Sequence, residues 1–173
     1  MRDLIYNQKK IPKEQWRYGF RSSAAVGCGW IATYNALRIL GWKAEPEELI
    51  RYYERQLPLI HGNAGTSIWA PAVFFKQQGF PVEVTANRKK FDDAARNADV
   101  CILFYRWHSR WKLGAHFVTV EHQDGIFVGY NTYTNSSGPD VYGQSLDGFL
   151  RKKKYFCPVL ISIHKKKENS PVR

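Results

Sequence analysis

The chain has 173 residues, of which 44% are hydrophobic and 15% aromatic, so it can bury a sizeable core. Ten phenylalanines, ten tyrosines and six tryptophans exclude an intrinsically disordered protein. No long uncharged apolar run is present, so we expect no transmembrane helix and no membrane partner. Residues 1–13 are polar and charged, without the apolar core of a signal peptide, so we expect a cytoplasmic protein unless a leader has been removed.

The formal net charge of +11 is concentrated in short clusters at residues 88–90, 151–154 and 165–167. Such clusters can bind nucleic acid or another polyanion, but they are more often solvated surface. Because no nucleic-acid-binding motif accompanies them, we do not expect a nucleic-acid partner. We expect a monomer with a single domain over residues 1–164 and a basic tail over residues 165–173.

The first half of the chain is predicted to be an extended arm followed by helices. Residues 1–27 have little periodicity and are predicted to form the arm. The first helix, residues 29–40, is apolar on nearly every face, so it should be buried centrally. Glycine and proline signals mark the ends of the elements, with a helix at 46–57, a loop at 58–65, and a third helix at 67–78 capped by Thr66 and closed by Gly79.

The second half is predicted to be mostly strands. Residues 81–85 alternate as a strand, residues 91–97 form a short helix, and the apolar run 100–107 is typical of a strand buried on both faces. Strands at 116–122 and 126–130 flank a hairpin turn, and a loop at 131–143 leads to a helix at 145–152. The last strand is predicted at 156–164, and Pro158 within it indicates either an edge strand or a position at the start of the strand. The pattern predicts an α+β fold whose first helix packs on a mostly antiparallel sheet.

Cys28 stands between Gly27 and Gly29, where the arm enters the first helix. Helix N-terminal N–H groups favour an anion, which would lower the thiol pKa, and they can also stabilise an oxyanion. A cysteine at the start of an apolar helix is more often a packing residue. The other two cysteines, Cys101 and Cys157, lie in apolar strand-like runs and are predicted to be reduced core residues, without disulfides.

His116 is the histidine best placed to act with Cys28. It is predicted to open a strand directly after a loop, so its side chain could face a cleft. A two-residue turn at Asp124-Gly125 would pair residues whose numbers add up to 249, which puts Asn131 about one diagonal from His116. A hairpin can therefore hold an imidazole and an orienting amide together. Each residue taken singly is better explained as a strand-end histidine or a turn residue.

The histidines and cysteines show no metal-binding spacing, and no glycine-rich phosphate loop precedes a helix. We therefore expect neither a metal nor a cofactor.

The ordered set of motifs resembles the papain-like cysteine peptidases, and most closely the C39-like peptidase family. The resemblance covers residues 6–163 and no single motif carries it. It comprises Tyr6-Asn7-Gln8, Trp16-Arg17-Tyr18-Gly19, Gly27-Cys28-Gly29, Gly79-Phe80-Pro81-Val82, Val100-Cys101-Ile102-Leu103 and Gly114-Ala115-His116-Phe117-Val118.

This resemblance implies a catalytic nucleophile at Cys28, a general base and acid at His116, a third member at Asn131 and an oxyanion-hole amide at Gln8. Gln15 could compete with Gln8 for that role. Substrate contacts are expected from three further residues, Gly29, Trp30 and Gly114. Trp30 stands where the family usually has proline or a small residue, and Asn131 replaces the more usual aspartate.

The resemblance predicts a cysteine peptidase that cleaves an amide bond of a peptide or related substrate through a thioester on Cys28. Two alternatives stay open at this point. One is a catalytically inactive papain-like fold used as a binding module. The other is a cysteine-dependent acyl or amide transferase, since the same triad serves transfer when an amine replaces water.

Overall fold

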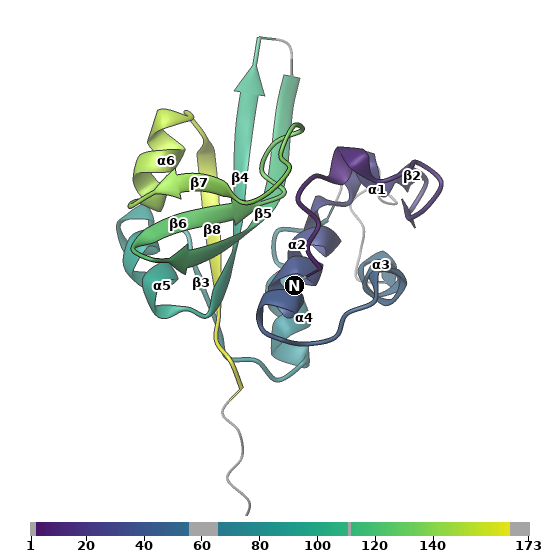
Figure 1. The fold of residues 1–173 in the computed structure, drawn as a ribbon, viewed down its shortest axis with the longest axis horizontal. Coiled ribbons are helices and arrows are strands. Elements are labelled where there is room, and N and C mark those ends of the chain that lie inside the picture. The colour runs from purple at the N-terminus through teal and green to yellow at the C-terminus, as the bar shows by residue number, and fades with distance from the viewer. Residues whose placement is uncertain (1–2, 56–65, 111, 167–173) are drawn as a thin grey trace, which may run out of the picture.

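The computed structural model describes residues 3–55, 66–110 and 112–166, and Figure 1 shows their arrangement. An antiparallel sheet of six strands, in the order β3-β8-β4-β5-β6-β7, forms the centre of the fold. Its strands are β3 (Val82–Thr85), β4 (Val100–Ser109), β5 (Lys112–Gln123), β6 (Ile126–Tyr130), β7 (Asp140–Gly143) and β8 (Phe156–Ile163). The mixed, mostly antiparallel architecture predicted from the sequence is confirmed.

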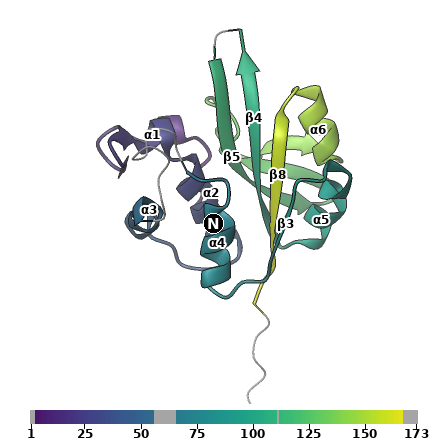
Figure 2. The same cartoon turned by 180° about the vertical axis from the view of Figure 1, so that it is seen from behind.

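Helices cover both faces of this sheet (Figures 1 and 2). On one face lie α2 (Cys28–Ile39), α3 (Pro46–Arg55) and α4 (Ala70–Gln77), and on the other lie α5 (Phe91–Asn97) and α6 (Leu146–Lys152). Strand β4 explains how one strand serves two cores. Its Ile102 and Phe104 belong to the larger apolar cluster, whereas Leu103 and Tyr105 belong to the smaller one. The prediction of a strand buried on both faces is confirmed.

Helix α2 is the central helix of the larger cluster, as the sequence predicted. It is buried almost all round, with Trp30, Ile31 and Ala36 fully inaccessible. Its attachment to the sheet includes a buried hydrogen bond from the Thr119 hydroxyl of β5 to the carbonyl of Ala32. The helix ends before Gly41, whose φ of 85° suits a glycine at a helix C-terminus.

The predicted extended arm instead contains several short elements. A 3₁₀ turn η1 (Gln8–Lys10), a small hairpin of β1 (Arg17–Tyr18) and β2 (Arg21–Ser22), and α1 (Ser23–Val26) precede Cys28. These elements are too short to show a hydrophobic period, which is why the sequence pattern missed them.

Two predicted boundaries in the sheet are wrong. Strands β4 and β5 continue to the pair Ser109–Lys112, so His116 lies inside β5 rather than at its start. The polar end of this hairpin projects beyond the rest of the sheet (Figure 1), and its polarity made it look like a loop. Strand β7 lies within the predicted loop 131–143. Of the two positions predicted for Pro158, the strand start is the one found, because β8 pairs with both β3 and β4 and is not an edge strand. Pro158 is accommodated near the start of β8, beside a register shift in its pairing with β4.

Thr66 does not cap a helix at 67–78, because α4 begins only at Ala70. The Thr66 hydroxyl is buried against the Tyr18 hydroxyl. The predicted loop 58–65 lies outside the described residues, and helix α3 is described to Arg55.

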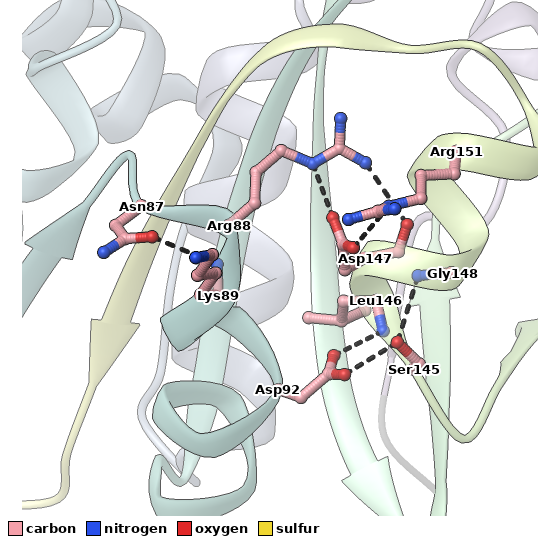
Figure 3. Close-up of polar contacts among 9 residues, drawn as sticks. All are labelled: Asn87, Arg88, Lys89, Asp92, Ser145, Leu146, Asp147, Gly148 and Arg151. Carbon is pink, nitrogen blue, oxygen red and sulfur yellow. Dashed lines mark hydrogen bonds and ion pairs between the residues drawn. The ribbon is translucent and has the colours of Figure 1, made fainter.

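Polar side chains connect the α5 and α6 regions on the face of the sheet opposite α2 (Figure 3). Asp147 accepts from the guanidinium groups of both Arg88 and Arg151. Asp92 accepts from the hydroxyl of Ser145 and from the backbone N–H of Leu146 at the start of α6. Part of the basic cluster at 88–90 is therefore committed to intramolecular ion pairing.

None of the described helices is long and apolar enough to cross a membrane. Within the described ranges, no group of histidine, cysteine, aspartate and glutamate side chains is arranged to hold a metal ion.

Candidate active site

The β5–β6 hairpin brings His116 and Asn131 together in the predicted register. The pairs Thr119↔Tyr130 and Gln123↔Ile126 both add up to 249, and Asp124 and Gly125 form the turn with φ of 49° and 81°. The Nε2 atom of His116 lies 2.6 Å from the backbone carbonyl oxygen of Asn131. Because a carbonyl oxygen only accepts, Nε2 carries the ring proton and Nδ1 is left with a lone pair. This is the tautomer that a general base needs.

The Asn131 side chain does not make the predicted contact with His116. Asn131 has a φ of 63°, and in this conformation its carbonyl rather than its amide reaches the ring. The side chain pairs with Gln8: Oδ1 accepts from the Gln8 backbone N–H at 2.8 Å, and Nδ2 donates to Gln8 Oε1 at 3.0 Å. His116 and Asn131 are therefore in contact, but through the backbone carbonyl of Asn131 and not through its side-chain amide.

Gln8 is brought to the site by the N-terminal segment, which runs between α2 and the end of β6. The Asn35 side chain of α2 holds this segment by accepting from the N–H of Ile5 and donating to its carbonyl, both at 2.9 Å. Asn7 donates to the carbonyl of Thr134. Gln8 Nε2 points to the carbonyl of Ala24 at 3.3 Å, so its role in an oxyanion hole stays a prediction.

Cys28 occupies the first position of α2 and is half-buried. The backbone N–H of Phe117, the residue next to His116, is near enough to the Cys28 thiol to lower its pKa. The packing of α2 on β5 explains this approach. Ala32 contacts Thr119, and one helical turn back along α2, about 6 Å, corresponds to about two residues back along β5. Helix and strand thus place the thiol beside the His116–Phe117 segment.

The expectation of a lowered thiol pKa is wrong for the free protein. Burial raises the pKa of Cys28, and this effect outweighs the lowering by the N–H groups of Phe117, Cys28 and Gly29 and by the charge of Lys9. Burial likewise lowers the pKa of His116, although its hydrogen bond to Asn131 acts in the opposite direction. Burial therefore favours the neutral form of both the Cys28 thiol and the His116 imidazole.

The other two cysteines differ from Cys28 and from each other. Cys101 is buried as predicted, and burial raises its pKa to about 12. Cys157 is exposed, so its assignment to the core is wrong. It has a φ of 47°, beside the register shift where β8 begins to pair with β4. This local irregularity turns its side chain away from the core.

The three predicted substrate-contacting residues have packing roles. Trp30 is 0% exposed and donates to the Ser23 hydroxyl, so it belongs to the core rather than to a cleft. Gly29 lies against the side chain of Thr66, where a Cβ atom would collide. Gly114 lies beneath the ring of Trp107 in the same way.

A cavity of about 580 Å³ opens beside His116. Gln8, Asn131 and His116 line it, together with further residues of which Lys153 and Lys154 belong to the basic cluster 151–154: Lys9, Tyr105, Trp107, Lys153, Lys154 and Tyr155. Of the described residues, Ala25 lines the cavity from the α1 side, whereas Cys28 does not line it. Tyr105 lies next to His116, because the two residues pair directly across β4 and β5.

Comparison with known proteins places this arrangement in a class of fold. No family model and no curated protein sequence matches the chain. Among solved structures, the chain resembles a peptidase domain, and at a distance the C39-like fold. That structure is the peptidase domain of Streptococcus ComA, a bi-functional ABC transporter involved in a quorum-sensing pathway. The TM-score is 0.55 at 11% sequence identity, over 80% of this chain and 91% of the other.

Proposed function

We propose that the protein is a cysteine-dependent amide hydrolase of the peptidase type. One observation carries the proposal: the Phe117 N–H is near enough to Cys28 to lower the thiol pKa, and Phe117 directly follows a His116 whose Nε2 is held by the Asn131 carbonyl. This leaves Nδ1 as the ring atom that can accept a proton. The fold similarity to a peptidase domain supports the same class of reaction. The substrate is then a peptide or another amide.

In the proposed reaction, His116 Nδ1 takes the proton of the Cys28 thiol as the sulfur attacks the substrate carbonyl carbon. The carbonyl electron pair moves onto oxygen, and N–H groups at the start of α2 are available to stabilise that oxyanion. When the oxyanion collapses, the C–N bond breaks and His116 returns the proton to the leaving nitrogen. Water then attacks the thioester, which releases the acid and restores the thiol.

The neutral resting pair defines the type of catalysis. A raised Cys28 pKa and a lowered His116 pKa disfavour a preformed thiolate–imidazolium pair. Proton transfer then accompanies attack on the substrate, so the rate depends strongly on the imidazole base.

The test is acylation of Cys28 by 4-nitrophenyl acetate, followed as nitrophenolate release and as an acetylated peptide by mass spectrometry. We expect wild type to acylate Cys28 and His116→Gln to be about a hundred-fold slower or more, since a general base contributes about 10² to 10⁴. Cys28→Ala should remove the Cys28 product altogether. His122→Gln, on the same strand, is the matched control and should retain the wild-type rate.

Equal acylation of Cys28 in wild type and His116→Gln would refute the catalytic pairing. So would acetylation confined to the exposed Cys157.

A second candidate function is a binding module with an inactive papain-like fold. Two observations favour it: the raised pKa of the Cys28 thiol, and the cavity wall, to which Cys28 does not contribute among the described residues. In that case wild type and His116→Gln would both leave Cys28 unacylated, while the cavity would still bind its ligand.

A further inference from the structure

We propose that the cavity beside His116 recognises an acidic peptide segment, through Lys9, Lys153 and Lys154. This inference names the substrate class of the proposed hydrolase and rests on that function only for what happens after binding. The three ammonium groups come from two distant parts of the chain, and all three residues line the same cavity as His116 and Asn131.

The backbone at each lysine is fixed by local hydrogen bonds. Lys9 lies in η1, where its N–H donates to the capping side chain of Asn7 at 2.9 Å. Lys153 and Lys154 follow the last turn of α6, and their N–H groups donate to the carbonyls of Phe149 and Arg151. Lys154 has a φ of 57°, so the chain turns sharply there and returns toward β8. The three lysines therefore reach the cavity from an ordered backbone.

The cavity has no carboxylate of its own to neutralise these charges. Aspartate and glutamate are absent from its wall in the described part of the chain. Within those same residues, none of the three lysines forms a salt bridge, whereas Arg88 and Arg151 share Asp147. Lys153 lies 4.9 Å over the ring of Tyr133. A carboxylate entering the cavity would meet positive charge that no described carboxylate of the wall neutralises.

The electrostatic effect of Lys9 reaches the reactive groups. Its charge lowers the pKa of both Cys28 and His116. A substrate carboxylate placed beside Lys9 would offset that charge at both groups. An acidic residue near the scissile bond would thus be held close to the atoms that react.

The shape and surroundings of the site favour a peptide over a nucleic acid. A volume of about 580 Å³ is that of an ordinary small-ligand pocket, which suits one or two side chains. Tyr105 and Tyr155 are stacked on each other, with centroids 4.2 Å apart and planes 4° apart, so these two rings already face each other. Two basic residues that could extend a phosphate-binding track, Arg88 and Arg151, are both paired with Asp147.

The test compares the binding of two peptides, acetyl-Glu-Glu-amide and its uncharged analogue acetyl-Gln-Gln-amide, to the variant Cys28→Ala. Binding is followed by NMR through the ring resonances of His116. Because this variant has no Cys28 thiol, the result does not depend on whether the protein is an enzyme. We expect the acidic peptide to bind at least ten-fold more tightly at low salt, with the preference falling as salt is added.

The variant Lys9→Gln/Lys153→Gln/Lys154→Asn should abolish the preference. Asparagine is chosen at 154 because it tolerates a positive φ. The control Lys76→Gln/Lys89→Gln/Lys90→Gln removes the same charge away from the cavity and should keep the preference. Thermal denaturation of both variants establishes that they are folded.

Equal affinity for the two peptides would overturn the inference, as would an equal loss of preference in the control variant. Displacement of the acidic peptide by an equimolar single-stranded oligothymidylate would assign the site to nucleic acid instead. A clear acidic preference together with failed acylation of wild type would keep the binding site and reject the proposed hydrolase.

Discussion

The two sides of the candidate site are held together in different ways. On the sheet side, His116 and Asn131 belong to one hairpin, and the two-residue turn at Asp124-Gly125 fixes which residues face each other. On the helical side, Cys28 and Gln8 depend on long-range contacts. The contacts are hydrogen bonds between Asn35 and Ile5, between Thr119 and Ala32, and between Gln8 and Asn131, which lie 123 positions apart in the sequence.

This difference shows which parts of the site are vulnerable. Hairpin geometry follows from local register, and many cross-strand pairs together stabilise it. The N-terminal segment instead depends on a few buried polar contacts, each of which leaves an unsatisfied partner when it is removed. Damage to the helical side should therefore cost more than equally small damage to the sheet side.

The largest effect is expected for Asn35→Ala. This fully buried side chain satisfies both the N–H and the carbonyl of Ile5, and alanine would leave both backbone groups without a partner. We expect the free energy of unfolding to fall by about 2–3 kcal/mol, measured by urea denaturation. Limited proteolysis should also cut the N-terminal segment sooner, because Asn35 no longer holds it on α2.

Asn97→Ala, at the exposed end of α5, is the matched control and should change the free energy of unfolding by less than about 0.5 kcal/mol. If Asn35→Ala were as mild as this control, the N-terminal segment would be held by something other than the Asn35 clamp.

A smaller effect is expected for Asn131→Gly, which tests where the two sides meet. Glycine removes the side chain that holds Gln8, but it keeps the carbonyl that bonds His116 and accepts the φ of 63°. We expect acylation of Cys28 by 4-nitrophenyl acetate to slow by less than about ten-fold, which corresponds to less than about 1.4 kcal/mol. Asn131→Ala should slow it more, because alanine disfavours that φ and would shift the carbonyl.

A loss of a hundred-fold or more in Asn131→Gly, matching that in Asn131→Ala, would show that the amide side chain orients the imidazole after all. The backbone assignment would then be wrong.

The same contrast explains how much of the molecule was predictable from sequence. The hairpin register, helix 91–97 and the buried central helix follow from turn residues and hydrophobic periods, which are local. The Asn35–Ile5 clamp has no such signal, because nothing in a single sequence relates residues 30 positions apart through a side-chain amide. Trp30 and Gly29 looked like cleft residues because a pattern gives neighbours of Cys28 but not the direction in which they point.

The prediction of a lowered pKa for the Cys28 thiol was wrong for a related reason. The sequence shows the helix start, which lowers the pKa of Cys28, but it does not show the depth of burial, which raises it. Only the assembled packing of α2 on β5 determines which effect is larger.

The smallest effect expected is a change in the pH dependence of stability caused by His116. Burial lowers its pKa in the folded protein below the ordinary value of 6.5, so the unfolded chain takes up the proton first as the pH falls. The contribution to stability is therefore complete above pH 6.5 and declines as the pH drops through that value toward the lowered folded pKa. His116→Gln removes this titration, so its urea midpoint should fall less between pH 7.5 and pH 5.5 than that of wild type. An identical decline in wild type and His116→Gln would mean that His116 is solvated in the folded protein rather than desolvated as the proposed reaction requires.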